Sequence, residues 1–151
     1  MSDHWIILIP EDPRFVPDGD QRARAKARLG EIAPDAQEIE VTISEKVEFF
    51  DCGGNFERIR CPACREEISV DWWGDRMNED FSDEGFKLAE YPTPCCGANR
   101  TMHDLIYEWP EGLGRFSLQV MNANIGRLDE AYKTELEAIV GTPLRVIYQR
   151  V

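Results

Sequence analysis

The pattern of apolar and polar residues predicts a strand followed by a helix at the start of the chain. Residues 5–9 form a continuous apolar run, which is typical of a buried strand. The pattern then predicts a helix over residues 18–29. Asp18 or Asp20 caps its start by accepting backbone N–H bonds, and Gly30 and Pro34 end it.

Four further core elements are predicted from the same kind of pattern. Residues 38–43 and 116–120 alternate apolar with polar side chains, which indicates strands that are buried on one face. Apolar residues at helical spacing predict a helix over residues 128–139, which Gly141 ends. Residues 144–148 make a closing strand.

The order of these elements predicts an α+β fold. Strand, helix, strand, then strand, helix, strand is the βαββαβ order of ferredoxin-like folds, in which two helices cover one face of an antiparallel sheet. Residues 1–151 form a single domain on this interpretation. Residues from about 45 to 110 are then a subdomain inserted between the second and third core strands.

The middle of the chain predicts further short strands. A polar break at residues 44–46 ends the second strand, and the alternation resumes at residues 47–49. Residues 53–55, Gly-Gly-Asn, resemble a hairpin turn that leads into residues 56–60. Two more strands are expected, one over residues 68–72 and one over residues 102–109.

Four cysteines in two close pairs predict a metal site in this middle segment. Cys61-Pro-Ala-Cys64 is a tight turn that presents two sulfurs to one point, and Cys95-Cys96 stands in a second turn before Gly97. Zinc in structural sites takes four ligands at the corners of a tetrahedron, and thiolates are its preferred ones. The sequence therefore predicts one structural zinc ion held by the four sulfurs. Buried apolar thiols, or a disulfide between neighbours, are the plain alternative.

Between residues 47 and 109 the motifs resemble the zinc-ribbon class, in which two cysteine knuckles on hairpins hold one zinc ion. The first knuckle matches well, although Arg65 stands where ribbons often carry glycine. The second resembles a knuckle whose first cysteine has become Thr93.

Two ligand sets therefore stay open at the second knuckle. Either Cys95 and Cys96 both bind the metal, which is the preferred set, or Cys96 binds it with a fourth group from elsewhere. Cys52 and His103 are the candidates for that group, although Cys52, beside two glycines, reads better as a buried turn residue.

Little in the sequence points to catalysis. A catalytic zinc keeps an open position and usually has histidine or carboxylate ligands, whereas this chain has two histidines, His4 and His103. The zinc-deaminase signature and a phosphate-binding loop are absent from the sequence. We therefore expect a structural metal and predict no catalytic residue.

The net charge of the chain favours some classes of binding partner over others. The chain carries 29 acidic and 17 basic residues, a net charge of −12. Such a surface repels the phosphate backbone of nucleic acids and attracts basic proteins. No apolar run approaches the length of a membrane span, and the first residues lack a basic leader. The expected location is the reducing cytoplasm, where five cysteines stay free or metal-bound.

The acidic middle segment predicts a surface for a basic partner. Carboxylates and aromatic residues alternate between Asp71 and Tyr91, a composition typical of interaction hot spots. A small core around the zinc is the plain alternative for the aromatic residues. The predicted partner-binding residues are Trp73, Asp75, Glu79, Asp80, Asp83 and Glu84.

These observations favour a non-enzymatic binding protein that engages a basic protein, such as a small acidic immunity or antitoxin protein that blocks a basic toxin. Two alternatives remain. Zinc ribbons commonly serve in nucleic-acid machinery, which would require a local basic face. An enzyme with a structural zinc would require a deep polar pocket.

Overall fold

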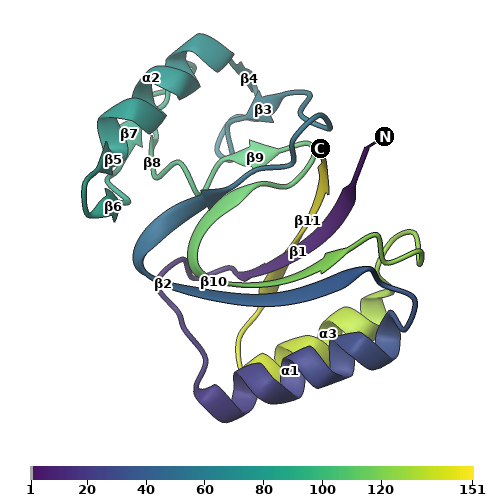
Figure 1. Cartoon of the computed structure of the whole chain (residues 1–151). Coiled ribbons are helices and arrows are strands. Elements are labelled where there is room, and N and C mark those ends of the chain that lie inside the picture. Colours follow the sequence, from purple (N-terminus) through teal and green to yellow (C-terminus); the bar gives the residue numbers. More distant parts are fainter. Residues whose placement is uncertain (1) are drawn as a thin grey trace.

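A computed structural model describes residues 2–151 and shows a mixed α+β architecture (Figure 1). The main sheet has the order β11-β1-β10-β2-β6-β5. Its four long strands are β1 (His4–Pro10), β2 (Glu38–Phe50), β10 (Gly112–Met121) and β11 (Leu144–Arg150). Its two short strands are β5 (Phe81–Ser82) and β6 (Gly85–Phe86). The helices are α1 (Gly19–Ile32), α2 (Val70–Asp80) and α3 (Glu130–Val140).

All neighbours among the four long strands are antiparallel. The two inner strands, β1 and β10, pair from Trp5↔Met121 to Leu8↔Leu118. The predicted order of these elements along the chain is confirmed, but the predicted break at residues 44–46 is wrong. β2 continues through them because a register shift opposite residues 114–116 of β10 takes up the extra residues. Arg115 Nε also donates a hydrogen bond to the Ser44 carbonyl at 2.9 Å.

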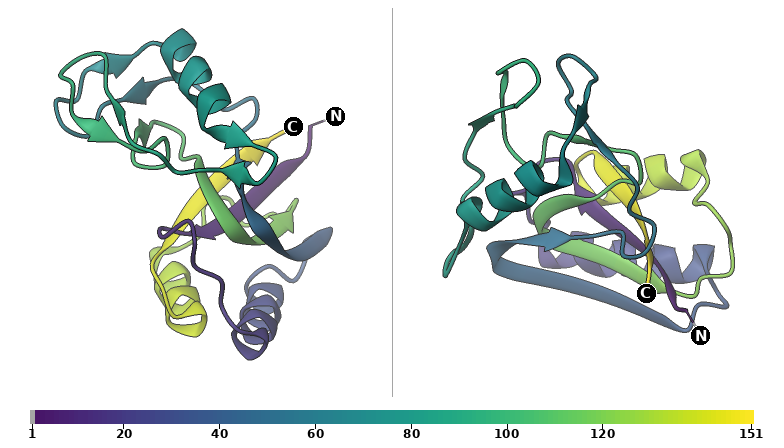
Figure 2. Two further views of the ribbon diagram at one scale, coloured as in Figure 1. Left: turned by 90° about the vertical axis from the view of Figure 1, so that its left-hand side faces the viewer. Right: turned by 90° about the horizontal axis from the view of Figure 1, so that it is seen from above.

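Helices α1 and α3 lie side by side on one face of the sheet (Figure 2). The Asp18 side chain accepts from Gln21 N, and the Gln21 side chain accepts in return from Asp18 N. This reciprocal capping box fixes the start of α1. Gly30 and Pro34 were predicted to end the helix. α1 continues past Gly30 to Ile32, two residues before Pro34, since Leu29 and Ile32 are both buried in the core. Their burial outweighs the cost of about 1 kcal/mol that one glycine imposes on a helix.

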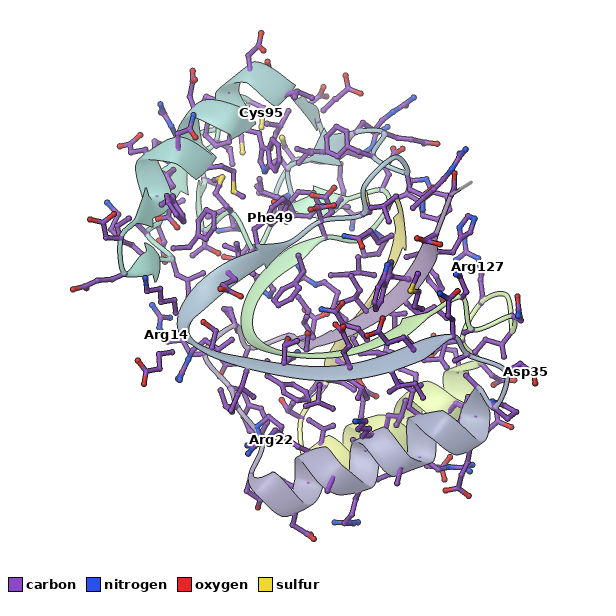
Figure 3. All side chains as sticks on the ribbon, viewed as in Figure 1. Arg14, Arg22, Asp35, Phe49, Cys95 and Arg127 are labelled. Carbon is purple, nitrogen blue, oxygen red and sulfur yellow. The ribbon has the colours of Figure 1, made fainter. Side chains whose placement is uncertain are left out.

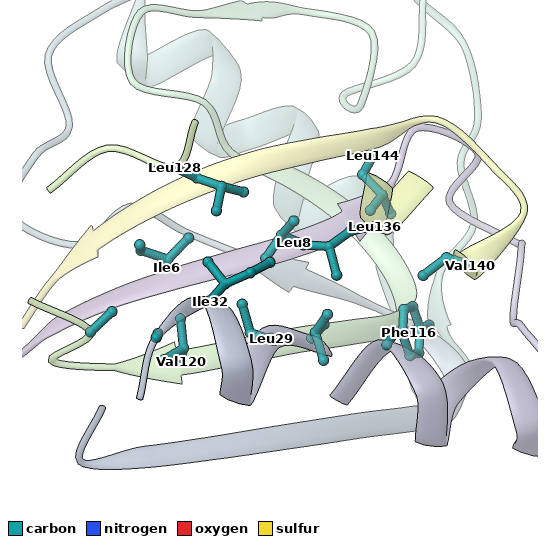
Figure 4. Close-up of a cluster of buried hydrophobic side chains, with 14 residues drawn as sticks. Ile6, Leu8, Leu29, Ile32, Phe116, Val120, Leu128, Leu136, Val140 and Leu144 are labelled. Atoms are coloured by element: carbon teal, nitrogen blue, oxygen red, sulfur yellow. The ribbon is translucent and has the colours of Figure 1, made fainter. Parts of the chain in front are cut away.

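The main core lies between these helices and the sheet (Figure 4). Alternate β1 residues such as Ile6 and Leu8 meet Leu29 of α1 and Leu136 of α3 there. α3 ends at Gly141, which adopts the left-handed conformation with φ 89°. Among residues 2–151, no helix has both the length and the apolar content required to cross a membrane.

The middle segment lies beyond the opposite face of the sheet (Figures 1 and 2). It contains a three-stranded sheet of β3 (Ile59–Arg60), β4 (Glu67–Ile68) and β9 (Ile106–Tyr107), with the order β4-β3-β9. A separate pair joins β7 (Tyr91–Pro92) to β8 (Asn99–Arg100). A second hydrophobic core, which includes Ile59, Ile68 and Tyr107, fills the space between these elements.

Three predictions for this segment are wrong. Residues 70–72 belong to helix α2, because Ser69 caps the helix and Trp73 and Met77, four residues apart, share its inner face. The Gly-Gly turn leads into no hairpin, since Gly53 instead bridges Arg150 at the end of β11. The strand expected over residues 102–109 is short, because Met102 and His103 are buried in a turn.

Candidate metal centre

The first cysteine pair lies in a tight turn between β3 and β4. Cys61 N donates to the Glu66 carbonyl at 2.9 Å, and Arg65 N donates to the Cys61 carbonyl at 2.9 Å. Arg65 has φ 68°, a left-handed conformation that glycine adopts at lower cost. Arg65, which stands where zinc ribbons often carry glycine, therefore occupies a position that requires a positive φ.

The second pair lies in a turn of the same construction between β7 and β8. Thr93 N donates to the Ala98 carbonyl at 3.0 Å, and Gly97 N donates to the Thr93 carbonyl at 2.9 Å. Gly97 has φ 76°. The two knuckles therefore match in backbone hydrogen bonding, with Thr93 at the position that Cys61 holds in the first.

The four sulfurs of Cys61, Cys64, Cys95 and Cys96 lie within 4.8 Å of one another. Cys61 Sγ and Cys96 Sγ are 3.7 Å apart, and Cys64 Sγ and Cys95 Sγ are 3.3 Å apart. A zinc ion with bonds of about 2.3 Å holds its tetrahedral sulfurs about 3.8 Å apart, so the spacing fits one metal ion. All four cysteines are free thiols. Figure 3 labels Cys95 and shows sulfur atoms beside it.

Hydrogen bonds favour the deprotonated thiolate form of Cys61 and Cys96. Burial opposes the charged form of Cys61, yet hydrogen bonds from the backbone N–H groups of Cys64 and Ala63 lower its pKa to about 6. A hydrogen bond from the Thr93 hydroxyl lowers the pKa of Cys96. Thr93 is itself buried, and its Oγ1 lies 3.4 Å from Cys96 Sγ and 3.7 Å from Cys61 Sγ.

Cys64 differs from these two thiols, because its sulfur donates a hydrogen bond to the Cys95 sulfur. Although the Glu66 backbone N–H favours its thiolate, the hydrogen bond that Cys64 donates to Cys95 raises the pKa of Cys64 to about 12. This hydrogen bond favours the protonated form of Cys64. A divalent metal supplies a compensating positive charge, so the cluster can hold a metal ion with all four positions filled by protein.

The two alternative ligands lie elsewhere. Cys52 is fully buried on the sheet face opposite the helices, and its thiol donates to Glu111 Oε1 at 2.9 Å. His103 Nδ1 accepts from Leu113 N, which leaves the proton on Nε2 to reach the Glu11 carbonyl at 2.8 Å. The cluster thus contains Cys95, and neither Cys52 nor His103.

The predicted partner-binding residues separate into two groups. The side chains of Asp75, Glu79, Asp83 and Glu84 are exposed on α2 and on the turn between β5 and β6. Trp73 and Asp80 belong instead to the interior, where they organise the second core.

Trp73 is half-buried and makes structural contacts. Its Nε1 donates to the Tyr107 hydroxyl at 3.0 Å, and its ring stacks on Phe56 with centroids 5.9 Å apart. Trp73 therefore packs the small core around the knuckles, as the plain interpretation of the aromatic residues expected.

Asp80 ends α2 and is fully buried. Its carboxylate accepts hydrogen bonds at 3.0 Å from Leu88 N, Ala89 N and the Tyr91 hydroxyl. Burial and this carboxylate raise the pKa of Tyr91 to about 12. Asp80 thus joins α2 to the segment that leads into the second knuckle, and it is not available to a partner.

One surface feature was missed in the sequence. Phe81 is 58% exposed at the edge of the main sheet, and it borders a cavity of about 670 Å³. The cavity is also lined by Phe49, Phe86 and Asp83. Phe81 follows a buried aspartate and precedes a polar turn, so no periodicity marked it as exposed.

Comparisons with protein-family models, with curated proteins and with solved structures find no match to this chain.

Proposed function

We propose that this chain is a non-enzymatic zinc protein that binds a basic protein through the acidic surface formed by α2 and the β5–β6 turn. The observation that supports this most directly is the exposed Phe81, which lines a cavity together with Asp83 and lies close in sequence to the exposed Glu84. An aromatic side chain beside a hollow, with charges around it, is the usual composition of an interaction hot spot.

The geometry of Phe81 suits such a role. Its ring contacts Phe86 edge to face, with centroids 5.2 Å apart, so one face is held while much of the side chain meets solvent. A held aromatic ring loses little conformational entropy when a partner covers it. The cavity next to it offers room for an apolar side chain of the partner.

Charge determines the class of partner. Asp75, Glu79, Asp83 and Glu84 are exposed here, and Arg76 pairs with Glu79 at 3.1 Å. Together with the net charge of −12, these carboxylates favour rapid encounter with a basic surface. An immunity or antitoxin protein that neutralises a basic toxin in the cytoplasm has these properties.

The metal serves this surface indirectly. We infer that the ion is zinc and that the segment between β2 and β10 is a zinc-ribbon-like insertion in a ferredoxin-like core. The donor set of four thiolates supports zinc. The order β11-β1-β10-β2, antiparallel throughout and covered by two helices, supports the ferredoxin-like core.

A role in nucleic-acid machinery receives less support from the knuckles. Arg58 precedes β3 and Arg60 lies in it. Both contact Glu108, Arg58 at 3.5 Å and Arg60 at 3.1 Å. Arg58 also lies 3.6 Å from Glu67. Paired in this way, these arginines contribute little positive potential for phosphate groups.

The first experiment immobilises the purified chain and identifies the proteins of the source cell that bind to it. We expect a basic protein whose association rate falls steeply as salt is raised, because steering between exposed charges is screened. Replacing Phe81→Ser together with Asp83→Lys should weaken binding at least about tenfold. The control is Asp20→Lys on α1, where the side chain is 80% exposed and remote in the fold. A partner whose binding is indifferent to salt and to the Phe81 variant would contradict the proposal.

A further inference from the structure

β2 has an unpaired outer edge over much of its length. One edge of the strand pairs with β10 from Glu38 to Phe50. On the other edge, within residues 2–151, β6 pairs with β2 only at Val47↔Gly85. Residues 38–45 therefore present backbone N–H and C=O groups that no strand of the described chain takes up. Such an edge is a template for an added strand.

The two sides of this edge differ in chemistry. Ile39 and Val41 pack at the margin of the main core on the helix side, and Ile43 is 55% exposed. Glu38 and Glu40 alternate with them and point to the other side of the sheet. A hydrogen bond with the Glu38 carboxyl raises the pKa of Glu40.

These charges decide which strand can add. Added as a parallel strand in register, a second copy of the chain would place its own Glu38 and Glu40 beside the same residues, and like charges across a strand pair are destabilising. A strand with lysine or arginine at alternate positions would instead neutralise both carboxylates. Its intervening apolar side chains would cover Ile39, Val41 and Ile43.

We propose that the free edge of β2, residues 38–45, binds an extended segment of the basic partner by strand addition, and that this segment alternates basic with apolar residues. This inference rests on the proposed function and names the mode of binding. Because β6 occupies the end of the same edge at Val47, an added strand would end beside the β5–β6 turn and Phe81. The added strand would thus lie next to the acidic surface.

The probe is a short synthetic peptide that alternates lysine and valine and is blocked at both ends. Its matched control carries N-methyl groups on alternate amides, which keep the charges and remove the hydrogen-bond donors. We expect the unmodified peptide to bind and to slow amide hydrogen exchange at residues 38–45. The methylated peptide should bind at least about tenfold more weakly, since it cannot donate the backbone hydrogen bonds that hold an added strand.

Variants of the protein complete the test. Glu38→Lys with Glu40→Lys should weaken peptide binding about tenfold, whereas Asp20→Lys with Glu31→Lys on α1 should leave it unchanged. Equal binding of both peptides, or no change in exchange along β2, would overturn strand addition and leave the proposed function standing. Failure of the peptide to bind at all would also overturn it, and failure of every basic protein would remove the proposed function as well.

Discussion

The Thr93 hydroxyl lies 3.7 Å from the Cys61 sulfur and takes, in the second knuckle, the place that the Cys61 thiol takes in the first. The backbone hydrogen bonds of the two turns are the same, so a cysteine at residue 93 would direct its sulfur into the cluster. Cys95, one residue before Cys96, supplies the missing sulfur instead. The adjacent cysteines are therefore explained by the threonine two residues earlier.

A variant in which the fourth sulfur comes from residue 93 in place of residue 95 should therefore still bind the metal. We expect Cys95→Ala to lower zinc affinity by more than about a hundredfold, because a thiolate is lost from the metal. Adding Thr93→Cys to that variant should restore most of the affinity. Metal content and competition with a chromogenic chelator measure both effects. Cys52→Ala, outside the cluster, should keep a full metal content, and loss of zinc in that variant would contradict the ligand set.

Removing the metal should unfold the middle segment before the core. Cys61 is a member of the second hydrophobic core, whereas the main core contains none of the four clustered cysteines. We expect a strong chelator, or Cys64→Ser, to abolish amide protection in residues 58–108 while β1, β10 and the helices α1 and α3 stay protected. Hydrogen exchange followed by mass spectrometry measures this. Uniform loss of protection would show instead that the two cores unfold as one unit.

The core was predictable because each of its elements has one strong period. Alternation in residues 116–120 and helical spacing up to Gly141 both survive in β10 and α3. The cysteine pairs were equally clear, since turn-forming residues surround them. These signals are local in the sequence and place the elements, although α3 starts at Glu130, two residues after the predicted start, because Asp129 caps it.

The failures arose where distant contacts decided the structure. Trp72 and Trp73 favour a strand by composition, but Trp73 gains its hydrogen bond to Tyr107 and its stacking on Phe56 only within helix α2. Asp80 lies in an acidic stretch that suggested a solvated surface. Its partners are the backbone of Leu88 and Ala89 and the Tyr91 hydroxyl, and no spacing rule announces them.

The Asp80 carboxylate should be a main determinant of stability in the middle segment. We expect Asp80→Ala to lower the free energy of unfolding by about 3 kcal/mol, because buried donors of Leu88, Ala89 and Tyr91 lose their acceptor. Urea denaturation of the zinc-loaded protein measures the change. Glu79→Ala, whose side chain is 54% exposed, is the matched control and should stay within about 0.5 kcal/mol of the parent. Equal effects would show that Asp80 is not structurally important.

Replacement by alanine should affect stability differently at two glycines of β10, Gly112 and Gly114. A Cβ at Gly112 would lie 2.8 Å from Arg145 Nη1, 2.9 Å from Ile9 Cδ1 and 3.0 Å from His103 Cε1. At Gly114 the nearest atoms would lie 3.8 Å away. We expect Gly112→Ala to destabilise the protein by about 1 to 3 kcal/mol and Gly114→Ala to be tolerated. Thermal unfolding of both variants measures the difference, and a tolerated Gly112→Ala would contradict the tight packing.

His103 should make stability depend on pH in the mildly acidic range. Burial, and the neighbouring Arg145 charge, lower its pKa from 6.5 to about 4. Between these values the unfolded chain binds the proton and the folded chain does not. Stability therefore falls as pH drops through this window, by about 1 kcal/mol at pH 5.5 relative to pH 7.5.

Glu111 acts in the opposite direction, since burial raises the pKa of its carboxyl and the folded state takes up its proton first. A comparison of variants isolates the histidine. We expect His103→Gln to be less stable at neutral pH, because the hydrogen bonds to Leu113 N and the Glu11 carbonyl are altered. Its stability should nevertheless fall less than that of the parent between about pH 7.5 and pH 5.5. Urea unfolding at several pH values measures both slopes, and parallel slopes would show that His103 takes up its proton equally in the folded and unfolded states.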